Sequence, residues 1–295
     1  MQSVKIQNYI HLHFLVIIAG FTAILGELIT LDAIHLVWYR MSIGAVLMLV
    51  YILAKKTPLR IPLKVLFSLS VAGVIIALHW ITFFAAINVS NISITLAMFS
   101  TGAFFASFIE PLFFKRKIIG YEILFGLIVI VGIVLITQTE LKYTLGIVLG
   151  ISSALFSTLF AVLNGKFVQH YPPSIISFYE FISGILFISI FLAFREDGFN
   201  HAFFQISSPD WVYLLILASV CTAYAFIVSV HVMKYITPYT VVLTYNLEPI
   251  YGIILALVFF PESETMRPMF YIGAGIIIFT VLLNAIFKNI KKTQI

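Results

Sequence analysis

Glu248 has the clearest capacity for chemistry, because it lies in a long apolar stretch and is followed by Pro249. An ionised side chain at the centre of a bilayer costs at least about 2.5–3.5 kcal/mol, so it requires a partner, a cavity or a function. Pro249 removes a backbone donor, which leaves a carbonyl free one turn earlier in a helix. A carboxylate beside such an interruption can bind a cation or an amine, or can exchange a proton. A purely structural bond between two helices is the alternative for Glu248.

Four other residues in apolar stretches have side chains suited to binding. Arg40 could hold a carboxylate or gate an outer opening, or it could extend to the membrane interface. For Glu180, as for Glu248, both a binding role and a structural role are open. The pair His79-Trp80 places a titratable imidazole beside an aromatic ring, which suits a cavity wall that stacks flat molecules or binds cations. Plain packing is the alternative for Trp80, since 16% of the chain is aromatic.

The composition says what kind of structure must position these residues. The 295 residues are 62% hydrophobic and 10% charged, and the mean hydropathy is +1.11. Soluble domains are nearer half apolar and a quarter charged. The net charge of +5 does not indicate a nucleic-acid partner, because the basic residues stand in short clusters between apolar stretches. The single cysteine, Cys221, excludes a disulfide framework or a cysteine-based metal site within one chain.

The apolar stretches predict an all-α integral membrane protein with ten transmembrane helices. A helix needs roughly 20 apolar residues to cross about 30 Å of hydrocarbon. The predicted spans are approximately 11–29, 35–54, 64–87, 92–114, 119–138, 143–165, 174–194, 211–234, 237–260 and 268–288.

The basic residues predict the orientation of these spans. With the N-terminus inside, only Lys142, Arg195 and Arg267 fall outside, and Arg40 lies within a span. Such a bias is typical of cytoplasmic loops, so we expect a multi-pass protein of the cytoplasmic membrane with both termini cytoplasmic. The thirteen residues expected inside are Lys5, Lys55, Lys56, Arg60, Lys64, Lys115, Arg116, Lys117, Lys166, Lys234, Lys288, Lys291 and Lys292.

An internal repeat divides the chain into residues 1–140 and 141–295. A shift of 147 residues lays 85–102 on 232–249 without gaps, and a shift of 140 lays Arg40 on Glu180. Because each copy has five spans, the second must enter the membrane inverted. Inverted repeats place a substrate site near the midplane, between the halves.

The second half carries a more specific pattern: Leu247-Glu248-Pro249, then Phe259-Phe260-Pro261-Glu262, then Gly273-Ala274-Gly275. This pattern resembles the drug/metabolite transporter superfamily of the EamA type. The first half departs from it, with Gly102 in place of the proline and Lys115 in place of the glutamate.

The resemblance implies that spans three, four, eight and nine line a central cavity. There Glu248, Trp80 and His79 would meet Tyr245, Asn246, Ser100 and Thr101, with Arg40 and Glu180 as further candidates.

The favoured function is a secondary transporter or exporter of small organic metabolites, amino-acid-like or drug-like, that works by alternating access. Protons are a possible coupling ion through Glu248, and Gly146-x-x-x-Gly150 could serve contacts within the bundle or in a homodimer. We expect no cofactor and no metal site. An intramembrane lipid-modifying enzyme, a channel and a structural bundle are the alternatives. Enzyme motifs such as a phosphate-binding glycine loop, His-Glu-x-x-His or Gly-x-Ser-x-Gly are absent from the sequence.

Overall fold

The computed structural model describes residues 2–115, 117, 120–196, 198–232, 244–245 and 247–292. Every regular element in these ranges is helical, as the sequence predicts. The α-helices are α1 (Gln2–Leu28), α2 (Ala33–Ala54), α3 (Leu63–Val89), α4 (Ile92–Phe99), α5 (Gly102–Phe114), α6 (Gly120–Thr139), α7 (Thr144–Phe167), α8 (Pro173–Ala193), α9 (Ser208–Ala218), α10 (Ala225–Val232), α12 (Glu248–Phe259), α13 (Pro261–Glu264) and α14 (Pro268–Lys292). Two short 3₁₀ turns, η1 (Leu141–Tyr143) and η2 (Ala202–Phe204), and one π-helix, η3 (Ser219–Tyr224), complete the elements.

Eight helical stretches in the described part of the chain are long and apolar enough to cross a membrane. Two shorter apolar helices follow them, Glu248–Phe259 and Pro268–Asn284. These agree with the predicted spans in position, but much of the predicted span 237–260 lies outside the described residues. The count of ten therefore stays a prediction.

Two spans expected to be continuous helices are interrupted. The stretch 92–114 consists of α4 and α5, separated at Ser100 and Thr101. The described part of the predicted span 211–234, which ends at Val232, is formed by α9, η3 and α10. Both interruptions leave the stretch apolar, so hydropathy alone gives no sign of them.

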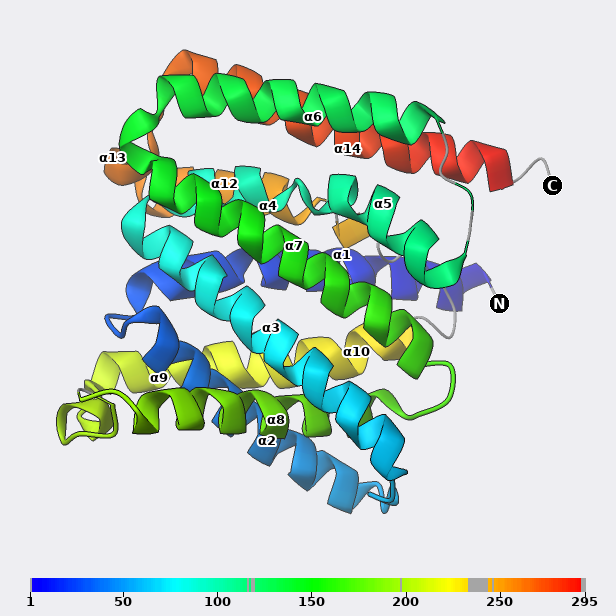
Figure 1. Ribbon diagram of the computed structural model, residues 1–295, viewed down its shortest axis with the longest axis vertical. Coiled ribbons are helices and arrows are strands. Elements are labelled where there is room, and N and C mark those ends of the chain that lie inside the picture. The colour runs from blue at the N-terminus through cyan, green and yellow to red at the C-terminus, as the bar shows by residue number, and fades with distance from the viewer. Residues whose placement is uncertain are drawn as a thin grey trace.

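The helix pairs α3–α7, α6–α14, α3–α8 and α2–α8 make the main interfaces of the bundle. In Figure 1, α6 and α14 lie along one edge of the molecule, and the marked ends of the chain lie at the same end of the bundle. Glycines bring several pairs close together. A Cβ built on Gly150 of α7 would lie 2.8 Å from the Met98 Cβ, so the Gly146-x-x-x-Gly150 segment serves packing within the bundle.

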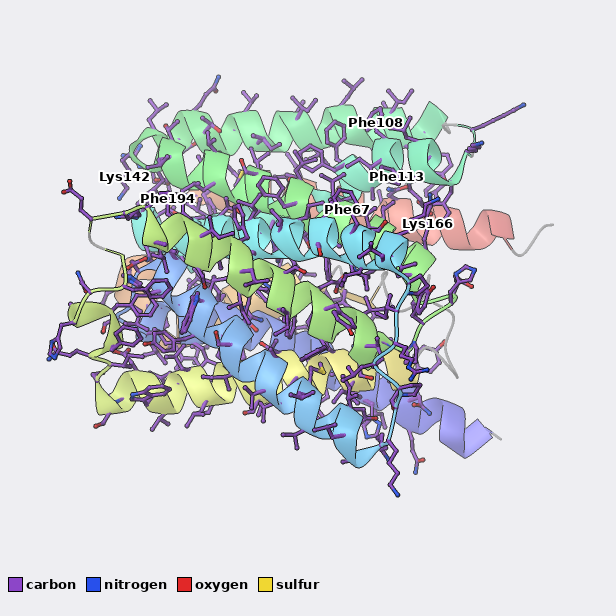
Figure 2. All side chains as sticks on the ribbon, turned by 60° about the horizontal axis from the view of Figure 1, so that its bottom comes forward. Phe67, Phe108, Phe113, Lys142, Lys166 and Phe194 are labelled. Carbon is purple, nitrogen blue, oxygen red and sulfur yellow. The ribbon has the colours of Figure 1, made fainter. Side chains whose placement is uncertain are left out.

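Large apolar side chains cover the outside of the bundle. Phe67 is 72% exposed and Phe194 is 89% exposed, and Figure 2 shows side chains of this kind on the outer faces of the helices. The same view places Lys142 and Lys166 at opposite ends of the bundle. An apolar perimeter with charges at the two ends is the arrangement that lipid requires.

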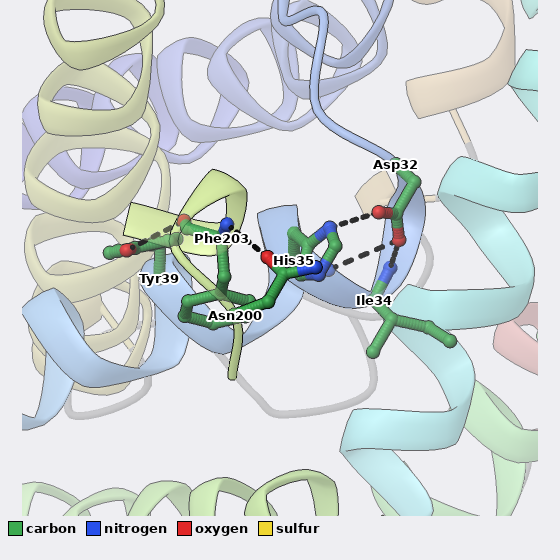
Figure 3. A network of polar contacts seen from close by, with 6 residues as sticks. All are labelled: Asp32, Ile34, His35, Tyr39, Asn200 and Phe203. Carbon is green, nitrogen blue, oxygen red and sulfur yellow. Dashed lines mark hydrogen bonds and ion pairs between the residues drawn. The ribbon is translucent and has the colours of Figure 1, made fainter. Parts of the chain in front are cut away.

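A polar network fixes the end of the bundle at which α2 begins (Figure 3). Asp32 caps α2 by accepting from the Ile34 and His35 amides, and it also pairs with the His35 ring. The Tyr39 hydroxyl donates to the Phe203 carbonyl over 3.1 Å, and the Phe203 amide donates to Asn200 Oδ1 over 2.9 Å. The loop before α9 is thereby attached to the helix that carries Arg40.

Candidate central binding site

Arg40 is the best-defined polar group inside the bundle. Its side chain is buried, with its Nε donating to Thr222 Oγ1 over 2.8 Å and its guanidinium lying 4.0 Å from the centre of the Trp80 ring. Arg40 Nη1 is buried without a hydrogen-bond partner. The alternative in which Arg40 extends to the interface is therefore wrong, since the side chain turns inward between α2, α3 and η3.

Aromatic rings surround the Arg40–Trp80 pair. Trp80 is 5% exposed and contacts Phe181 of α8 and Phe226 of α10, with ring centres 5.7 and 6.4 Å away. Phe84, one turn after Trp80, also lies beneath the guanidinium, 5.7 Å from it. Stacking a cation on these faces compensates part of the cost of removing it from water.

The π-helix η3 positions the hydroxyl that holds Arg40. Thr222 Oγ1 donates to the carbonyl of Leu217, five residues earlier, over 2.8 Å, and accepts the Arg40 Nε–H. A π-turn inserts an extra residue into a helix, and such turns occur frequently at functional sites. Thr222 therefore belongs to the candidate site, although nothing in the sequence distinguishes it from other threonines in apolar spans.

Glu248 begins α12, with Pro249 in the first turn of that helix. Its carboxylate interacts electrostatically with the Arg40 guanidinium, although no direct ion pair joins the two in the described part of the chain. Tyr245 packs against the buried cluster of Leu12, Leu15 and Val232. Asn246, the remaining candidate from this segment, lies outside the described residues.

His79 faces α7 rather than Arg40. Its Nδ1 lies 2.9 Å from Ser153 Oγ and 3.1 Å from the Ser153 carbonyl, and Ser153 Oγ donates to the His79 carbonyl over 3.2 Å. The ring also stacks on Phe99 of α4, with centres 5.4 Å apart. These bonds fix the α3–α7 interface beside the site and leave Trp80 as the member of the pair that meets Arg40.

Ser100 and Thr101 mark the interruption between α4 and α5. Their hydroxyls donate to carbonyls of their own chain, Leu96 O over 3.0 Å and Met98 O over 2.7 Å. Side-chain oxygens that bond locally compete with the helical backbone pattern, which explains why the helix stops here. Thr158 of α7 donates to the Gly102 carbonyl over 3.1 Å and so satisfies one acceptor at the interruption.

Glu180 is not joined to the other candidates. It is fully buried, accepts from Asn164 Nδ2 over 2.8 Å, and has Oε2 without a partner. Its backbone carbonyl lies against Gly73 of α3. Glu180 and Asn164 thus form a second buried polar pair between α7 and α8.

Arg40, Trp80, Thr222 and Glu248 together offer a cationic group, an anionic group and an aromatic wall. No group of three or more His, Cys, Asp or Glu residues that could hold a metal ion occurs among the described residues. The arrangement suits binding of a small organic molecule that carries charged groups.

The comparisons with known proteins concern the family and the fold. A family model described as the EamA-like transporter family matches residues 9–138 and again residues 144–286. A solved crystal structure of a protein superposes with a TM-score of 0.63 at 14% identity, covering 96% of this chain and 98% of the other. At that identity the likeness concerns the fold alone. A search of curated proteins gives no match.

Proposed function

Since the chain belongs to the EamA-like transporter family, we propose that it is a secondary transporter of small zwitterionic metabolites, amino acids among them, across the cytoplasmic membrane. The family consists of membrane transporters of small molecules, which leaves the lipid-modifying enzyme without support. Such a protein lies in a lipid bilayer and binds a small-molecule substrate.

The observation that carries the choice of substrate is the unpartnered Nη1 of Arg40. A buried guanidinium with a free donor gains a charge-assisted hydrogen bond when it meets a carboxylate. Glu248, which interacts electrostatically with Arg40 without a direct ion pair, supplies the matching partner for an ammonium group. Trp80, Phe181 and Phe226 are suited to contact the apolar part of the substrate.

The interrupted helices support alternating access between two inverted repeats, 1–140 and 141–295. The helix restarts after Thr101 in the first repeat and at Glu248 in the second, and a shift of 147 residues superposes these two positions. Interrupted helices at the midplane expose backbone groups to a substrate and are typical of carriers that rock one repeat against the other. The two separate family matches, 9–138 and 144–286, support the same division.

Energy for transport comes from a gradient in this proposal, and Glu248 is the group that exchanges a coupling proton. The orientation has both termini in the cytoplasm, and export is the direction we favour. A homodimer is compatible with the exposed apolar perimeter.

Thermal unfolding of the purified protein in detergent tests the substrate class. The ligands are phenylalanine, phenethylamine, which lacks the carboxylate, and 3-phenylpropionate, which lacks the amine. A ligand at 100 times its Kd stabilises the folded state by about 2.7 kcal/mol. We expect phenylalanine to stabilise most, because it engages both charges of the site.

Two variants then separate the charges. Glu248→Gln should weaken binding of phenylalanine and phenethylamine and leave 3-phenylpropionate unchanged. Arg40→Lys should weaken binding of phenylalanine and 3-phenylpropionate and leave phenethylamine unchanged. Glu262→Gln, at an exposed acidic residue, is the matched control and should change nothing. Equal binding of all three ligands by the protein and both variants would remove Arg40 and Glu248 from the substrate site.

A further inference from the structure

A second cluster of polar side chains lies away from the central site, where α5, α6 and α14 meet. A small cavity there has room for one water molecule or one small ion. Four of its lining residues have oxygen atoms in their side chains, and all four are buried: Ser107, Glu122, Thr280 and Asn284. The rest of the lining is apolar or backbone, including Phe104, Phe125 and Val129.

Both hydroxyl groups of this cluster already donate their protons to backbone carbonyls of their own helices. Ser107 Oγ donates to the Phe104 carbonyl over 2.7 Å, and Thr280 Oγ1 donates to the Ile276 carbonyl over 2.6 Å. Each hydroxyl oxygen can therefore offer only electron pairs to whatever occupies the cavity.

Asn284 supplies the observation that points to a ligand. Its side chain is 8% exposed, and its Oδ1 is buried without a hydrogen-bond partner. A buried amide oxygen left without a partner costs about 1–3 kcal/mol, so its presence calls for an explanation. A cation in the adjoining cavity would satisfy it.

We propose that this cavity is a sodium-ion site, with Glu122, Asn284, Ser107 and Thr280 as its oxygen ligands. Hard cations prefer carboxylate, carbonyl and hydroxyl oxygens, which is the set of groups present here. One carboxylate among neutral oxygens balances a single positive charge. A divalent ion would leave an uncompensated charge in an apolar surrounding.

The position of α5 gives the site a means to affect the centre of the bundle. Phe104 packs directly against Gly126 of α6, and Thr101, at the interruption of the α4–α5 stretch, is one turn away along the chain. An ion that holds Ser107 to α6 and α14 also fixes α5 below that interruption. Sodium binding would thus bias the shape of the interrupted helix, whatever the substrate is.

Thermal unfolding of the full chain in detergent, without any substrate, tests the site. Sodium, potassium and choline chlorides are compared at equal ionic strength. We expect sodium alone to raise the melting temperature, by several degrees at saturation, and the effect to disappear in Glu122→Gln and in Asn284→Ala. Glu262→Gln, at an exposed acidic residue, should retain the full sodium response.

Ser107→Ala is a milder variant, which tests the site even if Glu122→Gln or Asn284→Ala fails to fold. It removes only one neutral ligand. It should shift the half-saturating sodium concentration upward several-fold and keep the maximal response. Equal stabilisation by all three salts, or a sodium response that survives both Glu122→Gln and Asn284→Ala, would overturn the site. A response to pH alone that is lost in Glu122→Gln would overturn it in favour of a proton. Because no substrate is used, failure here leaves the zwitterion proposal standing, and failure of that proposal leaves the sodium site standing.

Discussion

At the scale of single residues, the centre of the protein contains a buried guanidinium whose hydrogen bonding is incomplete. Arg40 bonds to Thr222 through Nε and stacks on Trp80, yet Nη1 remains without a partner. A site in which every donor was satisfied would have no reason to bind a substrate carboxylate. We therefore interpret the incomplete bonding of Arg40 as capacity for a ligand rather than as a defect in packing.

The Thr222 hydroxyl should be necessary for this arrangement. Thr222→Val keeps the shape of the side chain but leaves the buried Arg40 Nε–H without an acceptor, which should reduce stability by about 1–3 kcal/mol. Thr222→Ser retains the hydroxyl and should cost much less. Thermal unfolding of the two variants in the same detergent measures the difference, and equal melting temperatures would show that the Arg40–Thr222 bond adds no stability.

At the scale of helices, the short helix α4 depends on a residue far away in sequence. Glu264 is fully buried and accepts from the Ile92 amide over 2.9 Å and from the Ser93 amide over 2.8 Å. Asn91 caps the same helix by accepting from the Ile94 amide over 2.9 Å. A helix of eight residues is marginal alone, so these caps connect the beginning of α4 to the segment between α12 and α14.

Removing the Glu264 carboxylate should therefore loosen α4. Glu264→Ala leaves two helix-start amides unpaired, and we expect a loss of about 2 kcal/mol. The exposed Glu262, two residues earlier, provides the control, since Glu262→Ala should change stability by less than about 0.5 kcal/mol. Similar melting temperatures for the two variants would contradict a capping role for Glu264.

The interface between α6 and α14 offers a test of close packing. A Cβ built on Gly273 would lie 2.8 Å from Ile136 Cγ1 and 2.9 Å from the Gly132 carbonyl, whereas one built on Gly275 would meet nothing within 4 Å. Gly273→Ala should lower stability by about 1–3 kcal/mol through overpacking. Gly275→Ala should be neutral or slightly stabilising, because alanine favours a helix. A fall in melting temperature of equal size in both variants would indicate that helix propensity, and not the contact, decides.

These elements also show what could be predicted from sequence. Length and apolarity locate the spans, because a membrane helix depends on little else. The interruption at Ser100 and Thr101 and the π-helix around Thr222 escape that reasoning, since both lie within unbroken apolar runs. Glu248, Trp80 and Arg40 can be identified from the sequence, because charged and aromatic side chains within apolar spans are conspicuous. That Arg40 stacks on Trp80, and that Glu180 bonds to Asn164, depends on how the four helices α2, α3, α7 and α8 pack. Such packing cannot be read from the local sequence around each residue.

At the scale of the whole molecule, the orientation in the membrane decides which end of the site opens to which compartment. The charge pattern predicts that Lys166 faces the cytoplasm and Lys142 the outside, and Figure 2 places these residues at opposite ends of the bundle. Cys221, the single cysteine of the chain, is buried, so it should give little background with a thiol reagent. The chain is therefore ready for a labelling experiment that needs only one added cysteine at a time.

With a membrane-impermeant maleimide on intact cells, Lys142→Cys should be labelled and Lys166→Cys should not. After the cells are opened, both should be labelled, which shows that each cysteine is reactive. The unaltered chain, with only Cys221, is the control. Lys166 lies near the Phe113 and Phe114 rings, 5.3 and 5.5 Å away, so its replacement removes a contact but no buried charge. The opposite pattern of labelling would show that the predicted orientation in the membrane is inverted. The end of the site that contains Arg40 would then face the cytoplasm.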